Sequence, residues 1–339
     1  MKIWIDFINT PQVSFFIPFI KEFKRKNHEV HLTCRDSGNT VALLEKNQLE
    51  FEVIGNRVGK GISEKLVLFP QRTLSLLRWA AKVEPDIAIG QSSFYMPIVA
   101  RILGIPSLYT NDNEYAKGNV FGFLLASKVL LPKALKNKNF VDTWPLKGKV
   151  EFYDGIKEGV YLSQEPQHND SFLIPNQKVI YFRPEPNSAQ YYHGPKYIFD
   201  DTLKSLSIEY PVVVLPRDLE QARHFQQLGV DRIQILSKPI ELQQIMANCL
   251  LFIGAGGSMN REMAILGAKV LSIYQSDLLA VDKYLIASGR IILSPNITVE
   301  AIRKIIRDES RPSRDLALLR EGERSYKMIL DQINQLKYA

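Results

Sequence analysis

The sequence predicts an α/β protein with two doubly wound domains, each built on a parallel sheet. A chain of 339 residues is long for a single hydrophobic core. Short apolar runs alternate with amphipathic segments of helical length, which indicates successive βαβ units. The alternation occurs twice, on either side of a stretch rich in Pro, Asn, Gln and Ser that is typical of a linker.

In the first half, the apolar runs and the amphipathic segments follow one another in short order. The expected strands are 2–7, 30–35, 51–55, 85–90 and 106–112, and the expected helices are 13–27, 39–48, 68–83 and 93–104. Gly104 suits the end of the last of these helices, because glycine readily adopts the left-handed conformation found there. Such an alternation predicts a parallel sheet with helices on both faces.

The second half repeats this organisation after the linker. Strands are expected within 178–186, 210–218, 231–238, 250–256, 269–274 and 290–293, and helices at 240–249, 258–267, 281–289, 298–308 and 313–337. We therefore expect an N-terminal domain at 1–165, a C-terminal domain at 176–312, and a final helix within 313–339 that packs back on the first domain. Ligands of such sheets bind beyond the carboxyl ends of the strands, and the expected site is a cleft between the two domains.

The composition and the sequence pattern indicate the cellular compartment of the protein. No apolar stretch approaches the roughly 18 residues of a membrane-spanning helix, and the N-terminus does not have the pattern of a signal peptide. Cys34 and Cys249 are far apart and are expected to be reduced thiols. These features predict a cytoplasmic protein.

Positive charge is concentrated in residues 115–149, which contain seven lysines and a single acid, Asp142, in a chain of net charge +7. Such a segment suits nucleic acid, an anionic membrane surface or a phosphorylated substrate, and a solvated lysine-rich face fits equally well. Within it, residues 119–135 combine apolar helical spacing with basic flanks, as does a helix that lies on a membrane. A buried helix followed by a basic loop would look the same.

The most informative stretch is IGAGGSMNREMAILG at 253–267, where a strand ends in glycines and a helix begins. Gly256 and Gly257 permit positive φ and a close backbone approach, and Ser258 can cap the helix or donate to a phosphate oxygen. The unpaired amides and the dipole of the helix start form an anion site. Glu262 follows Ser258 by one helical turn and is placed to accept from ribose hydroxyls.

This stretch resembles the nucleotide-sugar site of proteins with the GT-B fold, including MurG-type N-acetylglucosaminyltransferases and UDP-N-acetylglucosamine 2-epimerases. In that superfamily a glycine-rich turn precedes a helix whose glutamate holds the ribose. The whole chain is closer still to a bacterial and archaeal GT-B family described as a domain of unknown function. The matching stretches cover almost its full length: 3–16, 109–119, 147–162, 182–186, 215–221, 253–267 and 278–289.

Three further residues of the second half are candidates for donor binding. Arg183 in FRPEP and Arg217 in LPRD end two expected strands beside the glycine turn, where guanidinium groups suit a diphosphate. The alternative is a pair of surface ion pairs. For Asp282, the resemblance implies a role in reading the sugar.

In the first half, candidate site residues follow the first and fifth strands. Asn9 and Thr10 are expected to cap a helix or line the site, and relatives commonly carry a histidine where Gln12 stands. Glutamine cannot titrate, which leaves Asp112 and Glu114 as candidate general bases. The competing interpretation is that Asp112 caps a helix and Glu114 is solvated.

The sequence lacks the motifs that identify several classes of enzyme. The chain contains neither HExxH nor a DxD-type pair, so no metal site is expected, and it has no GxSxG or phosphate-binding P-loop motif. The sequence and the resemblance together predict a metal-independent glycosyltransferase that uses a nucleotide-diphosphate sugar, UDP-linked, and a cell-surface polysaccharide or lipid-linked acceptor. It would need no cofactor and no nucleic acid, and 115–149 would contact the inner face of the cell membrane. The alternatives are a 2-epimerase and a non-catalytic subunit that binds nucleotide sugar.

Overall fold

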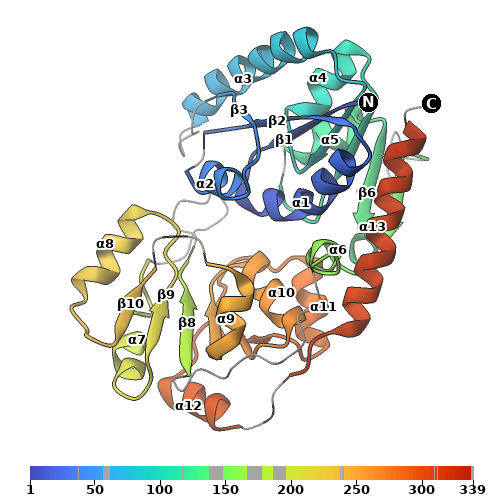
Figure 1. Cartoon of the computed structure of the whole chain (residues 1–339). Coiled ribbons are helices and arrows are strands. Elements are labelled where there is room, and N and C mark those ends of the chain that lie inside the picture. Colours follow the sequence, from blue (N-terminus) through green and yellow to red (C-terminus); the bar gives the residue numbers. More distant parts are fainter. Residues whose placement is uncertain are drawn as a thin grey trace. The chain divides into compact units, whose positions relative to one another are not determined.

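The computed structural model describes residues 1–36, 38–55, 62–116, 118–136, 148–165, 178–185, 196–236, 238, 240–308, 310 and 312–336. The chain forms two compact units, an N-terminal unit of Met1–Gln164, Leu279–Val281 and Leu318–Ala339 and a C-terminal unit of Glu165–Leu278 and Asp282–Ala317 (Figure 1). Most of the predicted linker lies outside the described residues, as do Lys117, Lys138 and Lys147 of the basic segment and residues 337–339.

The described part of the N-terminal unit contains one parallel sheet. Its strands are β1 (Lys2–Phe7), β2 (Glu29–Cys34), β3 (Glu52–Val53), β4 (Ile87–Gln91), β5 (Ser107–Thr110), β6 (Lys128–Pro132) and β7 (Val150–Tyr153). They are arranged in the order β3-β2-β1-β4-β5-β6-β7. The order reverses between β1 and β4, so a crevice is expected beyond the carboxyl ends of these two strands.

The helices of this unit cover both faces of the sheet. They are α1 (Thr10–Arg25), α2 (Gly38–Lys46), α3 (Ile62–Val83), α4 (Met96–Leu103), α5 (Asn119–Leu125), the 3₁₀ turn Lys133–Leu135, α6 (Lys157–Leu162) and, from Leu318 onward, α13 (Leu316–Leu336). Helix α1 packs through Phe15, Phe16 and Phe19, which are fully buried beside Phe7 of β1. These rings form edge-to-face and tilted pairs, the geometry that aromatic quadrupoles favour.

The C-terminal unit contains a second parallel sheet among its described residues. Its strands are β8 (Val179–Arg183), β9 (Val212–Val214), β10 (Ile233–Ile235), β11 (Cys249–Gly254), β12 (Val270–Ser272) and β13 (Ile292–Leu293), in the order β10-β9-β8-β11-β12-β13. Its helices are α7 (Asp200–Ser207), α8 (Leu219–Gln227), α9 (Leu242–Asn248), α10 (Gly257–Leu266), α12 (Val299–Arg307) and, from Asp282 onward, α11 (Ala280–Ala287). The order reverses between β8 and β11. Both predicted parallel sheets are thus confirmed.

One predicted element is wrong, and β7, α6, α7 and α8 were not among the predicted elements. Residues 119–135 do not form a single amphipathic helix, because α5 ends at Leu125 and residues 128–132 form the interior strand β6. Val129, Leu130 and Leu131 are fully buried. An interior strand of a parallel sheet is apolar on both faces, and a short apolar run of that kind does not differ from a buried helix by periodicity.

Helix α13 packs against α6 through two glycines. A Cβ atom on Gly322 would overlap the backbone of Gly159, and Ser325 Oγ and Tyr326 Oη donate to the carbonyls of Asp154 and Pro18 at 2.8 and 3.2 Å. The two helix backbones therefore approach too closely for any other residue at 322.

We predict that Gly322→Ala lowers the free energy of unfolding by about 1–3 kcal/mol, because the added methyl group must push the two backbones apart. Urea denaturation measures this change. Gln335→Ala, at an exposed position of the same helix, is the control and should have little effect. An unchanged stability for Gly322→Ala would show that this packing is looser than described.

Candidate functional site

The turn between β11 and α10 is shaped by the side chains that pack on its glycines. A Cβ atom on Gly254 would overlap the side chain of Asn260, and one on Gly256 would overlap the guanidinium of Arg217. The φ angle of Gly256 is −156°, so this residue is extended, and the predicted use of positive φ at the turn is wrong. A Cβ atom at Gly254 or Gly256 would therefore displace a polar side chain from the turn.

The two arginines predicted from FRPEP and LPRD both lie at this edge of the sheet. Arg183 Nη1 donates to the carbonyls of Leu215 and Pro216 at 2.7 and 2.8 Å. Arg217 Nε donates to the carbonyl of Pro184 at 2.8 Å. Burial, followed by repulsion from Arg217, lowers the pKa of Arg183 to about 9. The structure therefore brings the two cations together beside the glycine turn.

Helix α10 supplies the remaining groups of this edge. Gly256 is the N-cap residue, so Ser258 stands inside the helix and does not cap it with its side chain, contrary to one predicted role. Arg261 Nη2 lies 3.4 Å from Ser258 Oγ, and Arg261 Nη1 donates to Asp282 Oδ1 at 2.7 Å. Glu262 is partly exposed, and its charge attracts Arg183.

A pocket adjoins the turn within the C-terminal unit. Its walls combine apolar side chains with a few polar ones: Gly256, Gly257, Asn260, Ser272, Tyr274, Leu278, Asp282, Ile286 and Ile291. Asp282, predicted to read a sugar, is thus a pocket residue whose Oδ1 is engaged by Arg261.

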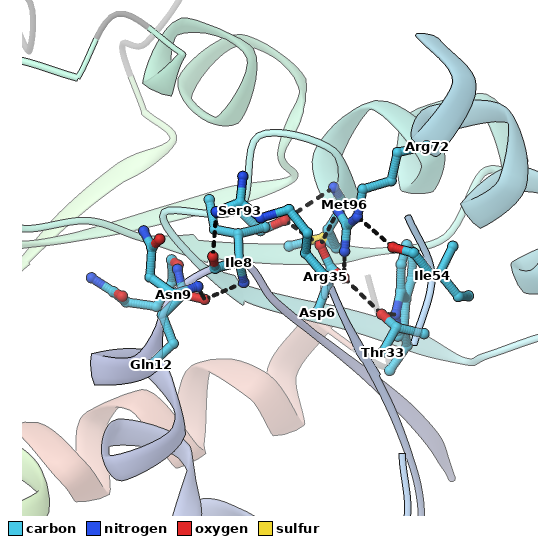
Figure 2. Close-up of polar contacts among 12 residues, drawn as sticks. Asp6, Ile8, Asn9, Gln12, Thr33, Arg35, Ile54, Arg72, Ser93 and Met96 are labelled. Carbon is cyan, nitrogen blue, oxygen red and sulfur yellow. Dashed lines mark hydrogen bonds and ion pairs between the residues drawn. The ribbon is translucent and has the colours of Figure 1, made fainter. Parts of the chain in front are cut away.

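In the N-terminal unit, Gln12 holds the turn between β1 and α1. Its side-chain oxygen accepts from the amides of Ile8 and Asn9 at 2.6 and 3.1 Å (Figure 2). Its Nε2 donates to the carbonyl of Gln91. Asn9 is the exposed N-cap of α1, and Thr10 lies 3.2 Å from the hydroxyl of Thr40. In these contacts, both the oxygen and Nε2 of the Gln12 amide bond to backbone groups. The side chain therefore stabilises the loop.

A fully buried carboxylate lies behind this loop, on β1 (Figure 2). Asp6 accepts from Arg72 Nη1 and Nη2 at 3.1 and 2.7 Å, from Thr33 Oγ1 at 2.7 Å and from Ser93 Oγ at 2.6 Å. Trp4 Nε1 donates to Thr33 in turn, at 2.8 Å. The network links the ends of β1, β2 and β4 with α3 and fixes the loops at the reversal of strand order.

We predict that Arg72→Met lowers the free energy of unfolding by about 3–5 kcal/mol, because Asp6 would remain charged and buried without its partner. Chemical denaturation followed by circular dichroism measures the loss. The double variant Asp6→Asn/Arg72→Met should recover part of it, since no buried charge remains. A single variant as stable as the wild type would contradict this account.

Asp112 belongs to a second buried cluster, beyond the carboxyl ends of β4 and β5. Its Oδ2 lies 2.8 Å from Lys157 Nζ, and its Oδ1 accepts from Gln91 Nε2 at 2.9 Å. Lys157 Nζ is also 3.6 Å from Glu158 Oε1. Lys157 is 4% exposed and Glu158 is fully buried. Gln12 joins this cluster through Gln91, so two predicted site residues, Asp112 and Gln12, are brought together.

Glu114 lies apart from these contacts. Its Oε1 accepts from the amide of Ala280 at 2.8 Å, where α11 begins. A carboxylate at a helix start satisfies an unpaired amide and favours the helix dipole. Glu114 therefore has a structural role in addition to any chemical one.

Three of the described lysines in the basic segment form ion pairs or backbone contacts. Lys128 and Lys133 pair with Glu151 and Asp154, and Lys149 Nζ donates to the carbonyl of Leu124 at 3.1 Å. Among the described residues, no helix is long and apolar enough to cross a membrane. Nor do the described histidines, cysteines and acids form a group of three that could hold a metal ion.

Sequence reasoning missed the partners in these clusters. Arg261, Lys157 and Glu158 were not predicted as site residues, although each lies within a stretch that carries the family resemblance. Their partners, Asp282 and Asp112, are 21 and 45 residues away along the chain. No local spacing reveals such pairs.

Comparison with known proteins places these features in a family. The family model described as "Protein of unknown function (DUF354)" matches residues 1–337. The uncharacterized protein MJ0665 of Methanocaldococcus jannaschii is 32% identical over 310 residues, which cover 88% of this chain and 89% of that protein.

Solved structures share the architecture at low sequence identity. The UDP-GlcNAc 2-epimerase of Neisseria meningitidis, bound to UDP-GlcNAc, has a TM-score of 0.73 at 16% identity and covers 98% of this chain and 100% of its own. MurG of Acinetobacter baumannii has a TM-score of 0.56 at 17% identity, with coverages of 99% and 100%. The predicted GT-B fold is confirmed, and the chain belongs to the DUF354 family.

Proposed function

We propose that this protein is a glycosyltransferase that takes a sugar from a UDP-linked donor and passes it to a cell-surface polysaccharide or lipid-linked acceptor. The observation that carries the proposal is the glycine turn at the start of α10, with Arg183 and Arg217 beside it and Glu262 one turn further on. Proteins of the same fold that were solved with UDP-GlcNAc support a nucleotide sugar as the ligand.

Each group of this edge has a role in the proposed reaction. The amides of the turn and the nearby guanidinium groups bind the diphosphate and stabilise its charge as it leaves. Glu262 accepts from the ribose hydroxyls. Asp112, in the N-terminal unit, is the proposed general base that takes the proton of the acceptor hydroxyl. Lys157 and Gln91 orient its carboxylate and hold it in one position.

One observation favours a second candidate, a 2-epimerase-like reaction on the sugar itself. Such chemistry needs several acid and base groups around one ring. The buried set of Asp112, Lys157 and Glu158 is a constellation of that type.

Incubation with UDP-GlcNAc, with and without a membrane-lipid and glycan extract, tests these candidates. Release of UDP only when the extract is present supports transfer. A changed sugar configuration, detected by proton NMR, supports epimerisation and overturns transfer. Binding by calorimetry without turnover under any of these conditions supports a non-catalytic subunit, and absence of binding to a panel of nucleotide sugars rejects the proposal.

We also propose a peripheral contact with the inner face of the cell membrane. Val120, Phe121 and Leu124 of α5 are between 38% and 48% exposed, and Lys149 lies at the end of this helix. An exposed apolar helix face with a cation at its edge suits an anionic membrane surface. Flotation with phosphatidylglycerol vesicles should recover the wild type but not Phe121→Asp. If the vesicles recover neither protein, the proposed membrane contact is wrong.

A further inference from the structure

The glycine turn is contacted by two guanidinium groups, one at each of two successive residues. The guanidinium of Arg217 occupies the place of a Cβ atom on Gly256, and Nη1 of Arg261 lies 2.5 Å from the place of a Cβ atom on Gly257. We propose that Arg217 and Arg261 are the two arms of a phosphate clamp that selects a diphosphate over a monophosphate, with Asp282 as the positioning residue of the second arm. This rests on the proposed nucleotide site.

The second arm follows from the geometry of α10. Side chains of an α-helix lean toward its N-terminus, so a residue at i+4 covers the turn below it. Arg261 stands four residues after Gly257 and therefore reaches back over the helix start. Its guanidinium also lies within 3.4 Å of Ser258 Oγ. Cationic groups at the start of a helix are repelled by the positive end of the helix dipole. An anionic ligand bound there would offset this repulsion.

Asp282 fixes the direction of this arm. Arg261 is 2% exposed and Asp282 is 7% exposed, and their ion pair of 2.7 Å joins α10 to α11. Burying such a pair costs solvation free energy, and two apolar side chains of similar size would hold the helices together at least as well. The charge pair is therefore better explained by what the guanidinium does at the turn. A rigid, planar fork aimed in advance also loses little entropy when it binds phosphate.

The clamp predicts that the loss of one arm affects the affinity for a diphosphate and the affinity for a monophosphate differently. A diphosphate has one phosphoryl group for each arm, whereas a monophosphate can satisfy only one arm at a time. Removal of either arm should therefore weaken the diphosphate strongly. A monophosphate can bind the remaining arm, so its affinity should change little.

Calorimetric titration with UDP and with UMP, at one fixed salt concentration, tests the clamp. Arg217→Gln and Arg261→Gln are each expected to lower UDP affinity by about 10- to 100-fold, as for a lost charge-assisted hydrogen bond. UMP affinity should change far less, so that the preference for UDP collapses. Asp282→Ala, which retains the arginine without its anchor, should lower the same preference. The weakening of UDP binding by added salt should also diminish in the arginine variants.

Two further variants keep the test decisive. Arg261→Gln leaves Asp282 charged and buried, so Arg261→Gln/Asp282→Asn serves where the single variant does not fold. Arg290→Gln breaks an ion pair of the same unit, Arg290 with Asp315 at 2.9 Å, and should leave both affinities unchanged. Equal losses for UDP and UMP would overturn the clamp and indicate a structural pair. Unchanged UDP affinity in the variants would overturn the clamp and leave the nucleotide site standing. A wild type that binds neither ligand would reject the nucleotide site and the clamp with it.

Discussion

Replacement of Asp112 by asparagine is expected to lower turnover of the nucleotide sugar by about 10²- to 10⁴-fold, the usual contribution of a general base. The amide has the same shape as the carboxylate, and its oxygen can still accept from one of the two donors, Gln91 Nε2 or Lys157 Nζ. It cannot take a proton from an acceptor hydroxyl. UDP affinity should be unchanged, because the residues proposed to bind UDP all belong to the C-terminal unit.

Steady-state kinetics with the donor that the wild type consumes measures this effect, and calorimetry measures UDP affinity. Asp331→Asn, at an exposed position of α13, is the matched control and should retain full turnover. If Asp112→Asn turns over at the wild-type rate, Asp112 is not the base. Glu114, which also accepts from the amide of Ala280, would then be the next residue to change.

The sequence was sufficient to predict the two sheets, because buried parallel strands and amphipathic helices alternate clearly along most of the chain. It failed at β6, where KVLLP continues the apolar pattern of α5. Both elements are short, and an interior strand has no polar face to produce a period of two. The distinction depends on Val129 and its neighbours pairing with β5 and β7, which is a property of the whole sheet.

The same division holds for the candidate site. The glycine turn, Arg217 and Glu262 could be predicted because each depends on a local transition from strand to helix. The reason for the glycines could not, since it lies in the side chains of Arg217 and Arg261 that pack on them. Likewise, the sequence shows only that Gln12 cannot titrate, whereas its contacts with Ile8, Asn9 and Gln91 show that the amide holds the loop.

The two clusters occupy equivalent places in their own sheets. In the N-terminal unit, Gln12 follows β1 and Gln91 ends β4. In the C-terminal unit, Arg183 ends β8 and Gly256 follows β11. In both sheets these are the strands between which the order reverses. Adjacent loops diverge there, so polar groups at the strand ends are not covered by a crossing connection. Topology therefore accounts for where each cluster lies, and residue identity for what it binds.

Glu262→Ala is expected to lower UDP affinity by about 10- to 100-fold, because a charged acceptor for the ribose hydroxyls is lost. The interaction is isolated by a ligand that lacks these hydroxyls, 2′,3′-dideoxyuridine diphosphate. The wild type should bind this analogue more weakly than UDP by a similar factor, whereas Glu262→Ala should bind the two ligands equally. Calorimetry of both proteins with both ligands completes the cycle.

The comparison separates a ribose contact from an indirect effect of the same residue. Glu262 also attracts Arg183, so its removal changes the charge near the diphosphate. An effect through Arg183 would weaken UDP and the dideoxy analogue alike, and the variant would still distinguish the two ligands as the wild type does. Glu300→Ala, an exposed glutamate in the first turn of α12, controls for a general loss of negative charge. Only a loss of discrimination specific to Glu262→Ala assigns the ribose to this carboxylate, and equal losses for both ligands would assign it to the charge balance around Arg183.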